Sequence, residues 1–169
     1  MNQNSIAAVF RALNASGARY LVAGGLAVVA HGYLRLTMDI DLIIQLHPDN
    51  LAKALEALRH LGYRPKAPVD VSDFAAPENR KRWMDEKGMV VFQLISDAHR
   101  TAPIDVFVQE PFDFDAVHAA APLREVDEGI EIRVVPLAEL LQMKERANRP
   151  KDQVDLLYLR KLQRDASDS

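Results

Sequence analysis

The stretch that decides the fold covers residues 20–44 and reads YLVAGGLAVVAHGYLRLTMDIDLII. Its first four residues are apolar and predict a strand, and a pair of glycines follows them directly. Apolar residues over 26–31 then predict a short helix, which the next glycine ends. The alternating and then β-branched residues over 38–46 predict a second strand. We therefore expect a strand, a glycine turn, a helix and a second strand that bears two aspartates.

Asp39 and Asp41 are two residues apart on the second predicted strand, so their side chains point to one face, roughly 6.5–7 Å apart along it. Two carboxylates so placed repel each other unless a cation lies between them. Carboxylate oxygens suit Mg²⁺ or Mn²⁺, and two such ions can share a site. An Asp-x-Asp pair alone is more often a solvated surface pair. Here the apolar run over 42–44 indicates a buried strand, in which the carboxylates need a partner.

Gly24 and Gly25 lie at the predicted turn between the first strand and the helix. Glycines let the backbone approach a phosphate closely, and the first turn of the following helix offers free N–H groups. A plain tight turn is the alternative, and the Gly-Gly pair alone favours it. The aspartate pair beyond the helix makes a phosphate-binding turn the more specific hypothesis.

A third acidic residue, Asp105, lies within the apolar run PIDVFV, which predicts a strand over 104–108. An edge-strand aspartate that faces water is the alternative interpretation. On a strand next to Asp39 and Asp41, this residue would complete a cluster of three carboxylates. Such a cluster can hold metal ions at a triphosphate and accept a proton from an attacking hydroxyl.

The C-terminal segment, about residues 136–164, predicts two closing helices. Lys144 continues the apolar face of the first, so it either extends to the rim or points into a cleft, where it would neutralise a triphosphate. In the second helix, Asp152 and Asp155 suit the positive N-terminal end, which is a sufficient structural reason for both. Lys151 beside them is either a phosphate contact or solvated.

The rest of the sequence predicts strands over 89–95 and 104–108, a hairpin over 123–135, and helices over 5–13, 48–61 and 112–119. Residues 63–88 predict a loop with a short helix near 78–86. Several strands follow one another without room for a helical crossover, which favours a mixed sheet over a purely parallel one. We therefore expect an α+β protein whose mixed β-sheet is flanked by helices.

Composition limits the function classes that remain. The chain has 169 residues, 49% apolar and 27% charged, so we expect one globular domain over residues 1–169. It has no cysteine, which excludes disulfides, thiolate metal sites and cysteine nucleophiles. A net charge of −3 does not suit a generically basic nucleic-acid coat. No apolar run approaches the ~20 residues that span a bilayer and no secretory signal pattern begins the chain, so we expect a cytoplasmic protein.

Taken together, the residues AGGLAVVAHGYLRLTMDIDLII resemble the nucleotidyltransferase superfamily related to DNA polymerase beta, and in particular its abortive-infection (AbiEii) and toxin-like branch. The C-terminal residues MKERANRPKDQVDLLYL are similar to the closing motif of that branch. The resemblance extends over about residues 18–160, although residues 63–100 carry little of it.

The resemblance implies transfer of a nucleoside monophosphate from an NTP to an acceptor, with release of pyrophosphate, on a mixed sheet flanked by helices. The positions that match the phosphate-binding turn, the metal ligands, the third carboxylate and the Lys and Asp of the closing motif are Gly24, Gly25, Asp39, Asp41, Asp105, Lys144 and Asp152. Arg35, Thr37 and Lys151 are further candidates for nucleotide contacts. Many active relatives carry Ser where this chain has Gly25, and many carry an additional helical domain.

The leading hypothesis is a metal-dependent nucleotidyltransferase that uses Mg²⁺ or Mn²⁺ and an NTP. Its acceptor would be a tRNA 3′ end or a small molecule such as an aminoglycoside or lincosamide. The chain would be the toxin of a toxin–antitoxin pair, with an antitoxin protein as partner, and acceptor choice would come from its own loops, from homodimerisation or from a partner. The alternative is a catalytically inactive module of the same fold that binds nucleotide or a protein.

Overall fold

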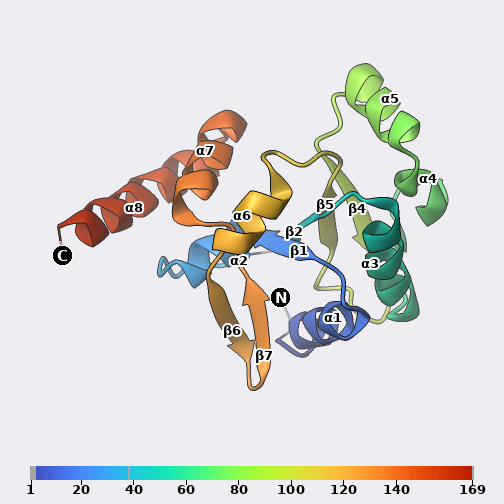
Figure 1. The fold of residues 1–169 in the computed structure, drawn as a ribbon, viewed down its shortest axis with the longest axis horizontal. Coiled ribbons are helices and arrows are strands. Elements are labelled where there is room, and N and C mark those ends of the chain that lie inside the picture. Colours follow the sequence, from blue (N-terminus) through green and yellow to red (C-terminus); the bar gives the residue numbers. More distant parts are fainter. Residues whose placement is uncertain (1–2, 38, 169) are drawn as a thin grey trace.

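A computed structural model describes residues 3–37 and 39–168 of the chain. Its centre is a five-stranded sheet with the order β1-β2-β5-β4-β3 (Figure 1). The β2–β5 pair is parallel, and the other three neighbouring pairs are antiparallel. The strands are β1 (Tyr20–Ala23), β2 (Ile40–Ile44), β3 (Arg64–Pro65), β4 (Val91–Ile95) and β5 (Ile104–Phe107). The predicted mixed sheet is therefore confirmed.

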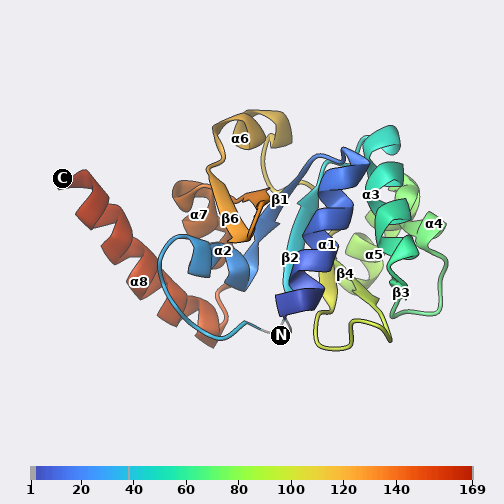
Figure 2. The ribbon, with the colours of Figure 1, turned by 90° about the horizontal axis from the view of Figure 1, so that it is seen from below.

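Side chains alternate across the sheet in β4 and β5, as the pleat requires. Phe92, Leu94, Ile104 and Val106 are buried on one face, whereas the residues between them are half-buried. Helices α1 (Gln3–Ser16) and α3 (Pro48–His60) pack against each other beside the sheet (Figure 2). The sheet thus has a fully buried face and a second face that is partly accessible.

Helix α2 (Gly24–Ala30) follows β1 without a separate turn, because both glycines belong to its first turn and Ala23 is its N-cap residue. The predicted strand–glycine–helix order is confirmed, but the helix begins two residues earlier than predicted. The second strand is shorter than predicted and begins at Ile40, whose N–H donates to the carbonyl of Pro103. Asp39 therefore precedes β2 instead of lying on it, and Met38 lies outside the described residues.

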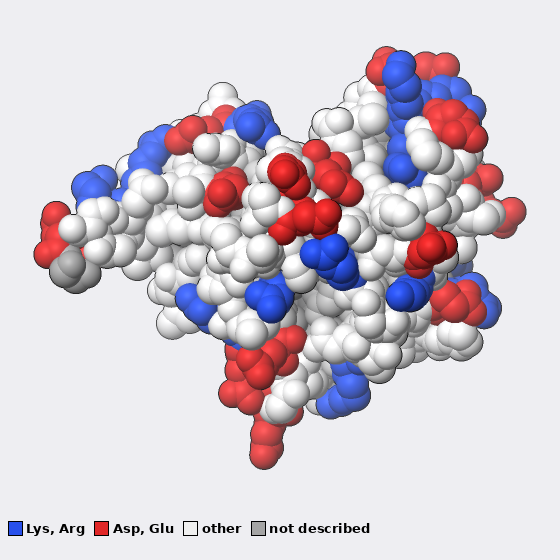
Figure 3. Space-filling view, in the orientation of Figure 1, with Lys and Arg blue, Asp and Glu red and all other residues white. Residues whose placement is uncertain are grey.

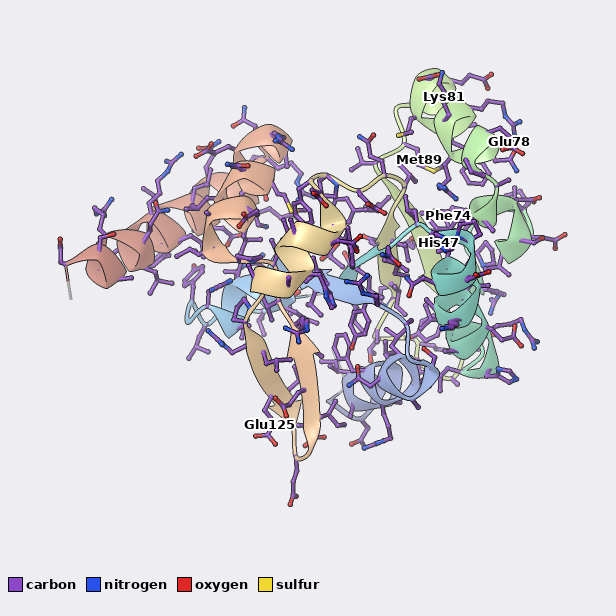
Figure 4. The ribbon with its side chains drawn as sticks, viewed as in Figure 1. His47, Phe74, Glu78, Lys81, Met89 and Glu125 are labelled. Atoms are coloured by element: carbon purple, nitrogen blue, oxygen red, sulfur yellow. The ribbon has the colours of Figure 1, made fainter. Side chains whose placement is uncertain are left out.

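The segment predicted as a loop with one short helix, 63–88, contains more structure. Besides β3 it forms α4 (Val71–Ala75), which a capping box begins, and α5 (Pro77–Lys87). Phe74 and Trp83 stack on Phe92 of β4, with ring centroids 4.8 and 5.4 Å apart. The polar face of α5, including Glu78 and Lys81, points away from the body (Figure 4). The predicted short helix near 78–86 is confirmed as α5, whereas the loop prediction missed β3 and α4, because aromatic contacts to a distant strand hold the segment in place.

The C-terminal part contains α6 (Phe114–Ala120), the predicted hairpin of β6 (Leu123–Asp127) and β7 (Ile130–Arg133), and helices α7 (Leu137–Ala147) and α8 (Pro150–Ser167). The hairpin is a separate two-stranded sheet that joins β1 through an isolated bridge between Val134 and Val22. Helix α8 packs on α7 and then projects from the body toward the C-terminus (Figures 1 and 2). None of the helices formed by the described residues combines the length and apolarity needed to cross a membrane.

Candidate active site

The two aspartates that the sequence places on separate strands are direct neighbours. Asp41 of β2 is in register with Asp105 of β5 across the parallel pair, so both side chains point to the partly accessible face. Asp39 lies two residues before Asp41, at the entrance to β2, and all three side chains are half-buried. The structure therefore brings together the three carboxylates that the sequence analysis singled out.

Repulsion among these carboxylates changes their pKa values. Burial, with the charges of Asp105 and Asp39, raises the pKa of Asp41 to about 6, and Lys144 and Lys151 oppose this shift. Burial and Asp39 likewise raise the pKa of Asp105. The charged form of the cluster is therefore unfavourable without added positive charge.

The chemistry of this donor set fits a hard divalent cation, because carboxylate oxygens are the ligands that Mg²⁺ and Mn²⁺ prefer. Within residues 3–37 and 39–168, however, no three His, Asp or Glu side chains are already arranged around one point as metal ligands. One oxygen of Asp105 instead accepts a hydrogen bond from Nε2 of Gln93 (3.1 Å). The carboxylates would have to turn toward a bound ion, and their role as metal ligands stays a prediction.

The two glycines leave room for site residues. Gly24 has a φ of +59°, and a Cβ there would overlap the carboxylate of Asp41. A Cβ on Gly25 would overlap the hydroxyl of Thr37 and lie 3.3 Å from Nη2 of Arg35. Glycine is thus required here by protein neighbours, whereas contact of this turn with a phosphate remains a prediction.

Lys144 of α7 does not extend to the rim. Its side chain is 6% exposed, and Nζ lies 3.1 Å from Oδ1 of Asp152 and 3.0 Å from Oδ2 of Asp155. The charge of Lys144 also lowers the pKa of Asp41, so the ammonium group lies near the carboxylate cluster. Burial alone would raise the pKa of Asp152, but hydrogen bonds from Arg149 and Lys144 lower it.

Asp152 and Asp155 do more than match the helix dipole. Both are buried, and each bridges two cations: Asp152 joins Lys144 to Arg149, and Asp155 joins Lys144 to Arg35. Contrary to the expectation from the sequence, the N-terminal position of α8 is therefore not the whole reason for Asp155, whereas Asp152 was also a predicted site residue through the closing motif. Because both oxygens of Asp152 accept hydrogen bonds from Lys144 or Arg149, its direct contact with a nucleotide stays a prediction.

Lys151 at the start of α8 is exposed, and its charge lowers the pKa of both Asp41 and Asp105. The start of α8 thus faces the carboxylate cluster. Three contributors escaped the sequence analysis: Gln93, Arg149 and the bridging role of Asp155. The sequence did contain a signal for Gln93. In VFQLI the side chains alternate between the two faces of the strand, and the pairing of Gln93 with Asp105 puts both side chains on the same face.

Residues 8–168 match the model of a protein family described as the nucleotidyl transferase AbiEii toxin of type IV toxin–antitoxin systems. The chain belongs to this family. It is accordingly a nucleotidyltransferase-family enzyme, as the resemblance in its sequence implied. No curated protein matches it.

Solved structures share the fold of this AbiEii family member. A lincosamide antibiotic adenylyltransferase, LnuA, bound to lincomycin, is 11% identical and has a TM-score of 0.60, over 96% of this chain and 98% of that one. The antibiotic-resistance factor ANT(2'')-Ia is 16% identical, with a TM-score of 0.56 over 93% of this chain and 80% of that one. A structure of ANT(2'')-Ia in complex with adenylyl-2''-tobramycin is also 16% identical, with a TM-score of 0.54 over 93% of this chain and 86% of that one. The predicted nucleotidyltransferase-type fold is confirmed.

Proposed function

We propose that this AbiEii family member transfers a nucleoside monophosphate from an NTP to an acceptor hydroxyl and releases pyrophosphate. The observation that carries the proposal is the register of Asp41 with Asp105, with Asp39 at the entrance to the same strand. Three carboxylates on one accessible face suit the binding of a metal–triphosphate complex. The membership of the chain in a nucleotidyltransferase family supports the same chemistry.

On the acidic side, Asp39, Asp41 and Asp105 would hold Mg²⁺ or Mn²⁺. Such an ion, when bound, orients the triphosphate and neutralises charge on the phosphoryl oxygens. Asp105 would also accept the proton of the acceptor hydroxyl. The acceptor oxygen then bonds to the α-phosphorus as the bond from that phosphorus to the β-phosphate oxygen breaks. The position of Asp105 next to Asp41 on the partly accessible face supports this role, because a base has to lie within hydrogen-bond reach of the hydroxyl that it deprotonates.

The groups that border the carboxylates would bind the triphosphate. The backbone of the α2 N-terminus and the charges of Lys144 and Lys151 would stabilise the leaving pyrophosphate. The nucleotide-binding set proposed here is Gly24, Gly25, Arg35, Thr37, Lys144, Lys151 and Asp152. Within it, Asp152 would act by holding Lys144, to which it is ion-paired.

For the acceptor we propose a hydroxyl of a tRNA 3′ end or of a small molecule. The toxin description of the family supports an acceptor whose modification is harmful and an antitoxin as protein partner. The structural similarity to LnuA with lincomycin and to ANT(2'')-Ia with adenylyl-2''-tobramycin supports a small hydroxyl compound. Because those identities are only 11% and 16%, experiment has to decide between the acceptors.

The test is incubation of the purified protein with each labelled NTP, Mg²⁺ and either total tRNA or a panel of small hydroxyl compounds. We expect Asp39→Ala to lower label transfer by more than about 100-fold, beyond the 10–100-fold loss typical of outer-shell partners. Asp49→Ala is the matched control, because Asp49 is an exposed aspartate at the start of α3. Absence of transfer to any acceptor, with undiminished NTP binding by Asp39→Ala, would instead support the inactive binding module.

A further inference from the structure

The loop between α2 and β2, residues 31–39, brings Thr37 and Asp39 to the site. Its two leucines do not hold it in place, because Leu34 is 82% and Leu36 93% exposed. A segment that delivers a carboxylate to a reaction centre has to be fixed to within a fraction of an ångström. The position of this loop therefore calls for another anchor.

Helix α8 contacts the loop at successive turns. Arg35 places Nε 2.8 Å from Oδ1 of Asp155, and its Nη2 donates to Oδ2 at 3.0 Å. Tyr33 stacks on Tyr158 with ring centroids 4.1 Å apart and an angle of 7° between the planes. A Cβ on Gly32 would lie 3.9 Å from Leu162. Positions 155, 158 and 162 share one face of a helix, so the loop follows that face in the opposite direction.

The ion pair is the strongest of these contacts. The side chain of Asp155 is 1% exposed, and it accepts one hydrogen bond from Nη2 of Arg35, while Nε of Arg35 lies at ion-pair distance from its other oxygen without forming a hydrogen bond. The same carboxylate holds Nζ of Lys144 at 3.0 Å. One buried group on α8 thus links the loop to the cation of α7.

The Arg35 nitrogen that donates to Asp155 also lies next to the glycine pair of α2. Nη2 lies 3.3 Å from the position of a Cβ on Gly25, and the Thr37 hydroxyl fills the space next to it. Thr37 in turn donates a weak hydrogen bond to the carbonyl of Asp39 (3.4 Å). Arg35, fixed by Asp155, and Thr37, bonded to the backbone of Asp39, therefore both border the same glycine at the start of α2.

We propose that Asp155 and Arg35 are positioning residues. Through their ion pair, α8 fixes the position of the loop that bears Thr37 and Asp39, and we call this role of α8 the splint. Neither residue needs to touch the reacting atoms for this role. An effect of this positioning on enzymatic activity can be measured only if the chain catalyses the proposed nucleotidyl transfer, so this part rests on the proposed function. Its structural part, the immobilisation of the loop by α8, stands apart from the reaction.

The first measurement is hydrogen–deuterium exchange of the full chain, without metal or nucleotide. In Asp155→Asn we expect the amides of 31–39 to exchange at least about 10-fold faster, while β4 and β5 keep wild-type protection. Arg160→Gln is the control, because Arg160 pairs with Glu145 on the exposed side of α8 and should leave the loop unchanged. Unchanged exchange of 31–39 in Asp155→Asn, or an equal increase throughout the sheet, overturns the proposal.

A second variant guards against misfolding of Asp155→Asn. Tyr158→Leu removes the stacking on Tyr33 and leaves the buried ion pairs intact, so we expect a smaller increase, confined to the same loop. Arg35→Lys keeps the charge but loses the planar fork, and we expect an effect intermediate between wild type and Asp155→Asn. If the amides of 31–39 exchange at the wild-type rate in both Tyr158→Leu and Arg35→Lys, α8 does not hold the loop and the proposal is contradicted.

The second measurement uses label transfer at increasing Mg²⁺. We expect Asp155→Asn to raise the half-saturating Mg²⁺ concentration by about 10–100-fold, the usual effect of an outer-shell partner. An Arg35→Ala, Asp155→Asn double variant should be no worse than the more severe single variant, because both act through one contact. Wild-type Mg²⁺ dependence in an active Asp155→Asn protein refutes the positioning role. A wild-type protein that transfers nothing refutes the proposed function instead, and the exchange result still decides the splint.

Discussion

Gly24 has to satisfy two requirements at the same residue. Its backbone has a φ of +59°, which L side chains rarely adopt, and the carboxylate of Asp41 fills the space where a side chain would begin. The cause of the second requirement is the antiparallel register of β1 and β2, in which Ala23 lies opposite Asp41. Gly24 therefore controls the position of a site carboxylate from the neighbouring strand.

Substitution of this glycine separates the two requirements. We expect Gly24→Ala to lower the free energy of unfolding by more than the ~1–2 kcal/mol that a left-handed backbone costs, and to abolish most label transfer, because Asp41 must move. Gly88→Ala is the matched control: its φ is +60°, but nothing lies within 4 Å of the added Cβ. Urea unfolding and transfer assays compare the two. Equal activity of both variants would contradict a steric role for Gly24.

At the residue scale, the sequence predicted which carboxylates meet but not why the glycines are needed. Asp39, Asp41 and Asp105 could be found because strand periodicity and apolar flanks are local signals. The overlap of Gly24 with Asp41 depends on a pairing between strands sixteen or more residues apart along the chain, to which no local pattern refers. The ion pairs of Asp155 were missed for the same reason, since its partners Arg35 and Lys144 lie on two other segments.

At the level of elements, the parallel pair of β2 and β5 carries an electrostatic cost. Folding raises the pKa of Asp41 to about 6, so the folded chain holds a proton more tightly than the unfolded chain does. The stability of the metal-free protein should therefore fall as the pH rises from about 4 to about 6. Above about pH 6 the free energy of unfolding no longer changes through Asp41, and the total decrease is roughly 2–3 kcal/mol at most.

Thermal unfolding in EDTA between pH 4.5 and 7.5 measures this dependence. We expect Asp41→Asn to flatten the curve relative to wild type, because the neutral amide does not titrate. Asp49→Asn, at an exposed position on α3, should keep the wild-type slope. Identical curves for wild type and Asp41→Asn would contradict the raised pKa of Asp41.

Elements with a clear apolar pattern or terminal signals were predicted well, whereas strand β3 and helix α4 were missed. Helices α1, α3, α7 and α8 have clear apolar faces or terminal Pro and Gly signals, and their existence was predicted. Strand β3 and helix α4 have two and five residues, too few for a period to appear. Their positions depend on contacts such as Phe74 against Phe92, which connect distant parts of the chain.

Over the whole molecule, charges of both signs are spread over the surface. Acidic side chains gather at the projecting β6–β7 hairpin, whereas Lys and Arg side chains alternate with acidic ones along α7 and α8 (Figure 3). The hairpin tip also points Glu125 away from the body (Figure 4). The carboxylate cluster lies on the central sheet, and the charges of Lys144 and Lys151 act on it. A bound cation should therefore stabilise the entire fold by removing repulsion at its centre.

Thermal unfolding with Mg²⁺ and a non-hydrolysable NTP analogue tests this coupling. At ligand concentrations near 100 times the dissociation constant, we expect a gain of about 2.7 kcal/mol, or ~5–10 °C in Tm. Asp41→Asn should lose most of that gain, and K⁺ at equal ionic strength should not reproduce it. A Tm that is insensitive to Mg²⁺ and nucleotide in the wild-type protein would argue against the metal–triphosphate site.

The parallel pairing of β2 with β5 has an evolutionary consequence. The two strands bring Asp41 and Asp105 together directly, so their pairing does not depend on a continuous stretch of chain between Ile44 and Ile104. That interval contains α3, β3, α4, α5 and β4, including the stretch with little resemblance to related sequences. Because β4 pairs with β5 and its Gln93 is bonded to Asp105, we expect the surface helices and loops of the interval to vary in evolution while β4 is retained.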